Sequence, residues 1–174
     1  MDLFTSARER RLWLWVLLTV AAIYATLFMG RPLANQLRDQ NLQAVIFVLG
    51  MLLAGTAVLL HGWRTKPGKF EMSVLLGIAA VYVMFFFRLG APERSHLIEY
   101  SVLAVFLHRA LLERSTNKKP SLSPALLAIG LGVLIGLLDE VLQFFLPNRT
   151  FDPEDMFFNG FAVIMAIAAS SLLN

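Results

Sequence analysis

The sequence predicts an all-α, polytopic integral membrane protein with six transmembrane helices. Hydrophobic residues make up 57% of the 174-residue chain and charged residues only 16%, whereas a soluble domain carries roughly 25% charged residues. The mean hydropathy is +0.67. The apolar residues are also gathered into runs of roughly 17–24, the length at which a helix crosses a hydrocarbon core of about 30 Å.

The first three predicted helices form an N-terminal membrane region over residues 1–90. The first apolar run covers residues 12–29 and follows three arginines, a pattern that signal peptides share. The run is long, however, and lacks a small-residue cleavage site, so we interpret it as a retained helix. The second run covers residues 42–62 and the third covers residues 70–87.

The last three predicted helices form a second region, residues 91–174, which carries the polar motifs. Each begins with a proline, which suits the first position of a helix. Their predicted bounds are residues 92–112, 124–146 and 153–174. Ser123 and Asp152 stand at N-cap positions, and Asp155 stands where a capping box has its second partner.

The distribution of basic residues predicts that both termini lie in the cytoplasm. With the N-terminus inside, ten of the 15 Lys and Arg residues fall in cytoplasmic segments, and cytoplasmic loops are enriched in these residues. The net charge of +3 therefore reflects topology, and we expect no nucleic-acid partner. We place the chain in the bacterial cytoplasmic (inner) membrane as a multi-pass protein in contact with membrane lipid.

Several common chemistries have no signal in this sequence. The chain has no cysteine, which excludes disulfides, thiolate metal sites and a cysteine nucleophile. It has no Gly-x-Ser-x-Gly and no His-Glu-x-x-His motif, which are the usual signals of hydrolases and zinc proteases. We assign no cofactor and no resident metal.

Ionisable residues in the last three helices mark the candidate site, because each costs about 2.5–3.5 kcal/mol at mid-membrane. With their polar neighbours they are His96, Glu99, Tyr100, Asp139, Glu140, Gln143, Asp155 and Asn159. At about 1.5 Å per residue they form two layers, roughly 5 and 10 Å below the outer helix ends. Within each helix their spacing of three or four residues defines one face. We predict a shared polar site on the extracytoplasmic side.

The roles of these residues stay open between two interpretations. Glu99, Asp139 and Glu140 form either a hydrogen-bond network that locks three helices together or a ligand site or acid/base centre. His96 is either a general base or metal ligand, or a structural hydrogen-bonding residue.

The connection before the sixth helix adds one basic candidate. Arg149 would hold a phosphate or carboxylate, or would form a salt bridge with Asp152 or Glu154. We interpret Asp155 as a helix cap first.

Two other groups of residues have structural interpretations. His108 and Arg109 lie near the cytoplasmic end of the fourth helix, where we expect them to snorkel toward the interface. Gly132 and Gly136 form a GxxxG pair, which predicts a close helix contact.

The polar stretches follow one another in a long pattern. They read His96-Leu-Ile-Glu99-Tyr100, then Gly136-Leu-Leu-Asp139-Glu140-Val-Leu-Gln143-Phe-Phe-Leu-Pro147-Asn-Arg149, then Asp152-Pro-Glu-Asp155-Met-Phe-Phe-Asn159. This pattern, which covers residues 92–170, resembles the VanZ-like family of membrane proteins. Ala162 and Ala166 replace glycines that are usual there, which keeps a small-residue face. Glu93 stands where a basic residue is often seen.

The resemblance implies a cell-envelope protein, and the family takes its name from a member associated with teicoplanin resistance. We expect binding of a lipid-linked, peptidoglycan-related or glycopeptide-antibiotic ligand at the outer-leaflet polar site, with a link to glycopeptide resistance as a further implication. The expected ligand-binding residues are His96, Glu99, Tyr100, Asp139, Glu140, Gln143, Arg149, Asp155 and Asn159.

The alternative is an intramembrane hydrolase or transferase that acts on a lipid or isoprenoid phosphate. In that case His96 and a carboxylate share the acid/base work, and a divalent metal held by Glu99, Asp139 and Glu140 is one version of it. A proton-coupled transporter ranks last, because polar residues do not continue across the inner halves of the last three helices.

Overall fold

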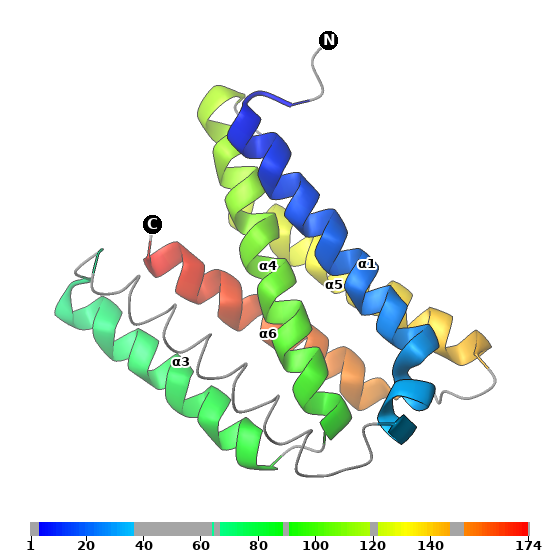
Figure 1. Ribbon diagram of the computed structural model, residues 1–174. Coiled ribbons are helices and arrows are strands. Elements are labelled where there is room, and N and C mark those ends of the chain that lie inside the picture. The colour runs from blue at the N-terminus through cyan, green and yellow to red at the C-terminus, as the bar shows by residue number, and fades with distance from the viewer. Residues whose placement is uncertain are drawn as a thin grey trace.

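All regular structure in the described part of the chain is α-helical, as predicted. The computed structural model describes residues 4–36, 64, 67–88, 91–118, 122–146 and 152–173. Its helices are α1 (Ala7–Gln36), α3 (Lys69–Arg88), α4 (Ala91–Asn117), α5 (Pro124–Phe145) and α6 (Pro153–Leu172) (Figure 1). These correspond to five of the six predicted helices. The predicted helix over residues 42–62 lies outside the described residues.

The helices α1 and α4 extend beyond the apolar runs that predicted them. Whereas the apolar run covers residues 12–29, α1 starts at Ala7 and ends at Gln36. Similarly, α4 ends at Asn117 and not at residue 112. Apolar runs mark only the part of a helix that suits hydrocarbon. At the start of α1 and the end of α4, Arg and Glu are good helix formers that continue the helix beyond the run. By contrast, α5 begins where predicted, and the backbone N–H of Leu126 donates to Ser123 Oγ at 3.2 Å.

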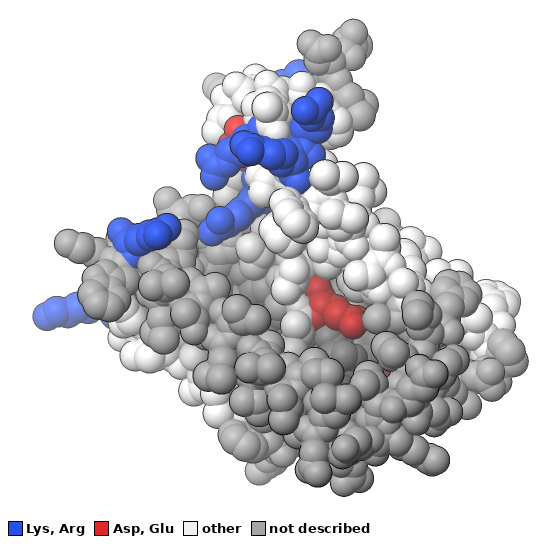
Figure 2. All heavy atoms as spheres, viewed as in Figure 1, with Lys and Arg blue, Asp and Glu red and all other residues white. Residues whose placement is uncertain are grey.

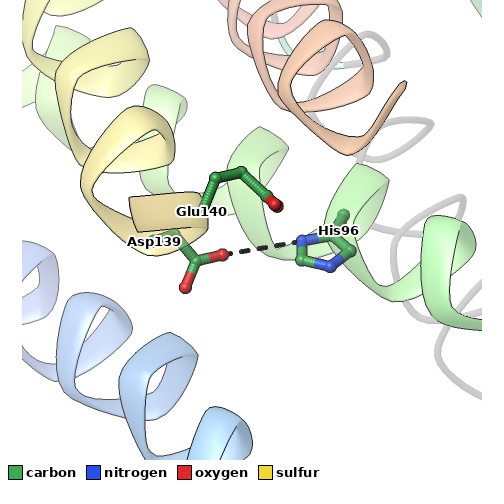
Figure 3. A group of neighbouring side chains, drawn as sticks. All are labelled: His96, Asp139 and Glu140. Carbon is green, nitrogen blue, oxygen red and sulfur yellow. Dashed lines mark ion pairs between the residues drawn. The ribbon is translucent and has the colours of Figure 1, made fainter. Parts of the chain in front are cut away.

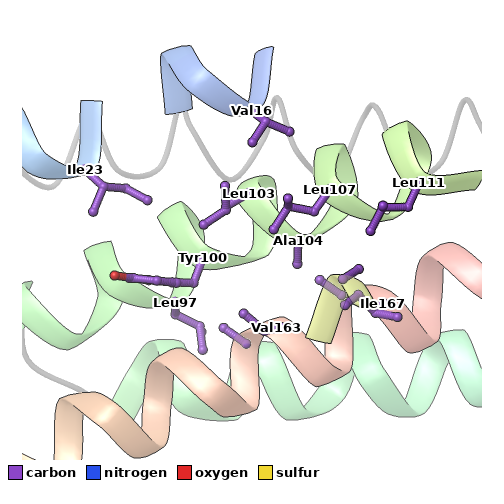
Figure 4. Close-up of a cluster of buried hydrophobic side chains, with 13 residues drawn as sticks. Val16, Ile23, Leu97, Tyr100, Leu103, Ala104, Leu107, Leu111, Val163 and Ile167 are labelled. Carbon is purple, nitrogen blue, oxygen red and sulfur yellow. The ribbon is translucent and has the colours of Figure 1, made fainter. Parts of the chain in front are cut away.

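The central element of the bundle is α4, which packs against α1, α5 and α6. Its buried residues Leu103, Ala104 and Leu107 meet Ile23 from α1 and Val163 from α6 in one apolar core (Figure 4). The helix α3 lies along α6. The polar groups described below lie beside this core, toward the start of α4.

The contact between α3 and its neighbours is mainly aromatic. The Phe85 ring meets the rings of Phe158 and Phe161 edge to face, at centroid distances of 5.7 and 5.2 Å. The hydroxyl groups of Tyr82 and Ser101 are 2.8 Å apart, which joins α3 to α4. Edge-to-face pairs contribute about 0.5–1.5 kcal/mol beyond their buried area, so these rings fasten α3 to the bundle.

Small residues let α5 and α6 approach each other closely, as the GxxxG pair predicted. A β-carbon at Gly132 would stand 2.9 Å from both methyl carbons of Val163. On the other helix, Ala162 and Ala166 are buried, so alanine suffices at the positions where the family pattern has glycine. Close backbone approach of this kind is typical of helix pairs in membranes.

The helices α5 and α6 carry apolar residues outward and polar residues inward. Exposed positions of α5 include Leu134, Leu138, Val141, Phe144 and Phe145, while its buried residues include Asp139, Glu140 and Gln143. This distribution is the reverse of that in a soluble helix. Of the helices described, α5 and α6 are long and apolar enough to cross a membrane. Six spans therefore stay a prediction, and the described residues support two of them.

Basic side chains gather at one end of the bundle. Figure 2 shows Lys and Arg over the end where α1 begins and over the start of α3. There the buried Glu9 carboxylate joins α1 to α4: it accepts hydrogen bonds from the Thr5 N–H and hydroxyl at 2.6 and 2.7 Å, and from Arg114 Nη1 at 3.1 Å. Trp13 Nε1 adds a fourth donor at 3.2 Å. The N-terminal turn is therefore fastened to the end of α4.

Candidate functional site

The first feature of the candidate site is a histidine between two carboxylates. On α4, His96 has its Nδ1 atom 3.9 Å from Asp139 Oδ2 of α5 and its Nε2 atom 3.8 Å from Asp155 Oδ2 of α6. Figure 3 shows Asp139 and Glu140 projecting from α5 toward the imidazole ring. Three helices that are far apart in sequence therefore bring their polar groups together, as the matched depths predicted.

The second feature is a pair of adjacent carboxylates held by neutral donors. Asp139 and Glu140 are both fully buried, and Gln143 is 3% exposed. Gln143 Nε2 donates to Glu140 Oε1 at 3.2 Å and lies 3.5 Å from Asp139 Oδ2. The backbone N–H of Asp152 reaches Glu140 Oε2 at 3.3 Å. The spacing of Gln143 from the two acids, three and four residues, makes this arrangement possible on one helix face.

Below this layer lie Tyr100 and Asn159, one helical turn further from the ends. A β-carbon at Gly136 would stand 3.3 Å from Tyr100 Cε1 and 3.2 Å from Asn159 Cβ. The lack of a side chain at Gly136 thus makes room for both residues. Tyr100 is fully buried and lies within electrostatic reach of Asp139. Its ring also stacks on His96, with centroids 6.2 Å apart.

The start of the sixth helix is capped by the predicted residue. Asp152 is the N-cap as predicted, and its Oδ1 accepts from the Glu154 N–H at 2.9 Å. The Asp152 N–H donates to Glu140 Oε2 of α5 at 3.3 Å. Asp155 stands in the first turn of α6, and its Oδ2 atom also lies 3.8 Å from His96 Nε2. Both contacts come from neighbouring helices, so spacing within one helix does not indicate them.

Two predicted site residues are not members of the described cluster. Glu99 is only partly buried on α4, and it acts electrostatically on Tyr100. Arg149 lies outside the described residues. The described part of the site therefore comprises His96, Tyr100, Asp139, Glu140, Gln143, Asp155 and Asn159.

The first helix contributes a residue that the sequence analysis did not assign. The Tyr24 hydroxyl lies 3.5 Å from the backbone oxygen of Ile135 and within electrostatic reach of Asp139. Its signal in the sequence is a single phenol in the apolar run over residues 12–29, but nothing there indicates that α1 packs beside α4. The site therefore draws on four helices.

Three side chains are arranged as potential metal ligands. One ligand atom each from His96, Asp139 and Glu140 lie within 4.8 Å of one another, and all three residues are buried. The alternative metal set predicted from the sequence used Glu99 in place of His96. Within the described residues, the group of ligand atoms includes His96 and not Glu99. The sequence alone does not show which of these two side chains faces α5.

Further along α4, His108 does not snorkel as expected. It is 3% exposed, and its Nδ1 atom lies 3.0 Å from Ser170 Oγ of α6. The prediction was wrong because α4 continues for two more turns beyond His108, which leaves that residue inside the bundle.

Comparisons with known proteins place the chain in a family. No curated protein and no solved structure shows significant similarity to it. The model of the VanZ/LLP1 family matches residues 13–174, which includes the N-terminal helices as well as the motifs in residues 92–170. Because the match covers nearly the whole chain and two helices are apolar enough to span a bilayer, the chain belongs to the VanZ/LLP1 family and is a membrane protein.

Proposed function

We propose that this protein binds a cell-envelope ligand within the outer leaflet of the bacterial cytoplasmic membrane. The ligand is lipid-linked, peptidoglycan-related or a glycopeptide antibiotic, and it connects the protein to glycopeptide resistance. The observation that carries the proposal is the cluster that the buried His96, Asp139 and Glu140 form with the partly exposed Asp155 between three helices. Apolar side chains on the outside of α5 allow a lipid tail to lie against the bundle beside the cluster.

A purely structural role explains this cluster poorly. Hydrogen bonds between membrane helices contribute only about 0.6 kcal/mol on average, and a buried polar group left without a partner costs about 1–3 kcal/mol. Asn159 is 1% exposed, and neither of its amide atoms has a hydrogen-bond partner among the described residues. A bound ligand, or water held by it, would supply these hydrogen-bond partners. In a purely structural network, the protein itself would already supply them.

The charge distribution supports an orientation with the cluster on the extracytoplasmic side. The basic end of the bundle, where Arg114 meets Glu9, lies at the opposite end of α4 from His96. Cytoplasmic segments are enriched in Lys and Arg. We accordingly place both termini in the cytoplasm and propose six spans, the second of them over residues 42–62.

Each group in the site has a task that suits this ligand. Asp139 and Glu140 accept hydrogen bonds from hydroxyl or amide donors of a sugar or peptide, and Asn159 both donates and accepts. By its place in the sequence between α5 and α6, Arg149 is proposed to meet an anionic head group in bidentate fashion.

Binding to purified, tag-free protein in detergent tests the proposal. The probes are teicoplanin and a polyprenyl-diphosphate-linked muropeptide, each titrated against the wild type and the double variant Asp139→Asn/Arg149→Gln. We expect the wild type to bind at least one probe and the double variant to lose it while its thermal unfolding stays cooperative. Unchanged binding by the folded double variant would falsify the proposal.

The matched control is Glu154→Gln, which removes one acidic charge from an exposed position at the start of α6. It should bind like the wild type. An equal loss of binding in this control would show that overall charge, and not the buried cluster, governs the interaction.

A second candidate function is hydrolysis or group transfer on a lipid or isoprenoid phosphate. The arrangement that favours it is His96, whose two ring nitrogens each face a carboxylate, because acid/base histidines are oriented in this way. Release of inorganic phosphate from the polyprenyl-diphosphate probe by the wild type, lost in His96→Gln, would favour the enzyme. Binding without turnover favours the ligand-binding function.

A further inference from the structure

We propose that His96, Asp139 and Glu140 bind a first-row divalent cation, Zn²⁺ or Mn²⁺, and that this ion receives an anionic group of the ligand. The role of the ion in receiving the ligand rests on the function proposed above. The metal site itself rests on the geometry of the three side chains and is tested without any ligand.

The three ligand atoms are close to the spacing that a metal requires. They lie within 4.8 Å of one another. Two atoms bound to one Zn²⁺ at about 2.0–2.2 Å are roughly 3.3–3.6 Å apart in tetrahedral geometry. Each pair therefore needs to approach by about 1.5 Å at most, which side-chain rotations provide while the helices stay in place.

The groups around the three ligands are those that commonly orient metal ligands. With its Nδ1 atom on the side of Asp139, His96 presents its Nε2 atom to Asp155 Oδ2 at 3.8 Å. A carboxylate behind a ligating histidine selects the tautomer and raises ligand basicity. Gln143 and the Asp152 N–H donate to Glu140, and ligating carboxylates are normally hydrogen-bonded in this manner.

The Asn159 side chain points to bound solvent at this place. It is 1% exposed, lies one turn below Asp155 on α6, and has no hydrogen-bond partner for either amide atom within the part of the chain described. Three protein ligands leave at least one coordination position open for water or substrate. Water on such an ion would donate to the Asn159 oxygen.

Charge also favours a cation here. The carboxylates of Asp139, Glu140 and Asp155 would repel the phosphate of a lipid-linked ligand at close range in a medium of low dielectric constant. A bound divalent ion reverses the local field and offers a coordination position to the anion. Imidazole with two carboxylates suits Zn²⁺ or Mn²⁺, whereas Mg²⁺ and Ca²⁺ prefer oxygen ligands alone.

Metal binding to the full chain tests this inference directly. Purified, tag-free protein is stripped with a chelator and dialysed against Zn²⁺ or Mn²⁺, with Mg²⁺ and Ca²⁺ in excess as competitors, and bound metal is measured by elemental analysis. We expect one ion per chain. In Glu140→Gln and His96→Gln we expect at least a tenfold loss of affinity, and in Asp155→Asn about a 10–100-fold loss.

The controls are Glu154→Gln, which is exposed, and Glu99→Gln, which replaces the acid outside the grouped ligand atoms. Both should bind metal like the wild type, and thermal unfolding confirms that each variant is folded. The inference is overturned if folded Glu140→Gln and His96→Gln keep full affinity, if the wild type binds neither ion, or if Glu99→Gln loses the metal. Metal binding without binding of either envelope probe would support the site while refuting the proposed function.

Discussion

Gly132 of α5 lies directly against Val163 of α6, so that a β-carbon at Gly132 would stand 2.9 Å from both valine methyl carbons. Real β-carbons do not approach other atoms this closely. Val163 cannot easily rotate away, because a β-branched side chain in a helix has one strongly preferred rotamer. The distance between α5 and α6 is therefore set by the absence of a side chain at this position.

Gly132→Ala should destabilise the protein. The methyl group would force the two helices apart, and overpacking of this kind costs about 1–3 kcal/mol. Gly130→Ala is a matched control on the same helix, because nothing lies within 4 Å of a β-carbon there. Alanine favours a helix over glycine by about 1 kcal/mol, so the control should be as stable as the wild type or more so. Thermal unfolding in detergent measures both, and equal midpoints would contradict the close contact.

Gly136→Ala should damage the site more than the fold. Its β-carbon would meet Tyr100 Cε1 at 3.3 Å and Asn159 Cβ at 3.2 Å, a tight fit that small shifts relieve. Those shifts move the two residues beneath His96 and Asp139. We expect affinity for Zn²⁺ or for the envelope probe to fall several-fold while the unfolding midpoint falls less than in Gly132→Ala. A variant with normal affinity would show that Tyr100 and Asn159 do not shape the site.

The junction between α1 and α4 should weaken at acidic pH. Burial alone would raise the pKa of Glu9, but hydrogen bonds from Thr5 and Trp13 and the charge of Arg114 outweigh it, so this pKa lies below its ordinary value of 4.5. A carboxyl with a lowered pKa in the folded state stabilises the protein above the unfolded pKa, and the effect is lost as pH falls through the folded pKa.

Glu9→Gln tests that dependence. At pH 7 the variant should unfold several degrees below the wild type, because the amide keeps only part of the hydrogen bonding and loses the ion pair with Arg114. As the pH falls through the folded-state pKa of Glu9, which lies below 4.5, the two midpoints should converge, since both side chains are then neutral. The exposed Glu154→Gln serves as the control and should follow the wild type throughout. A constant difference between Glu9→Gln and the wild type would argue against the lowered pKa.

Ser170→Ala should destabilise the bundle through His108. The imidazole is buried and loses its 3.0 Å partner, and a buried group without a partner costs about 1–3 kcal/mol. Ser171→Ala is the matched control, because Ser171 is exposed and donates to the Ile167 carbonyl of its own helix at 2.8 Å. The double variant His108→Leu/Ser170→Ala should recover part of the loss. If Ser170→Ala and Ser171→Ala have the same unfolding midpoint, water replaces Ser170 as the hydrogen-bond partner of His108.

The proposed orientation is tested with single cysteines, since the chain has none of its own. Leu122→Cys, before α5, and Glu154→Cys, at the start of α6, are both at exposed positions. In intact cells a membrane-impermeant maleimide should label Glu154→Cys and not Leu122→Cys, and permeabilised cells should label both. The reverse pattern would place the candidate site on the cytoplasmic side.

The sequence predicted the helical class, five helices that the structure describes and the face of each polar helix. It succeeded there because these features depend on local spacing: an apolar run implies a buried helix, and residues three or four apart share a face. It erred where neighbours compete. The interpretation of His108 as a snorkelling residue used only its own helix, whereas its partner Ser170 lies on α6.

By itself, the sequence determined that this chain is helical, that its acids are set among apolar residues and that they share faces and depths. Only the tertiary structure decided which groups meet. It placed His96 between Asp139 and Asp155, joined Tyr24 of the first helix to the site, and left Glu99 outside the group of ligand atoms. Helix rotation and crossing depend on the packing of small residues such as Gly132 against Val163. That packing is a long-range property, and no local spacing encodes it.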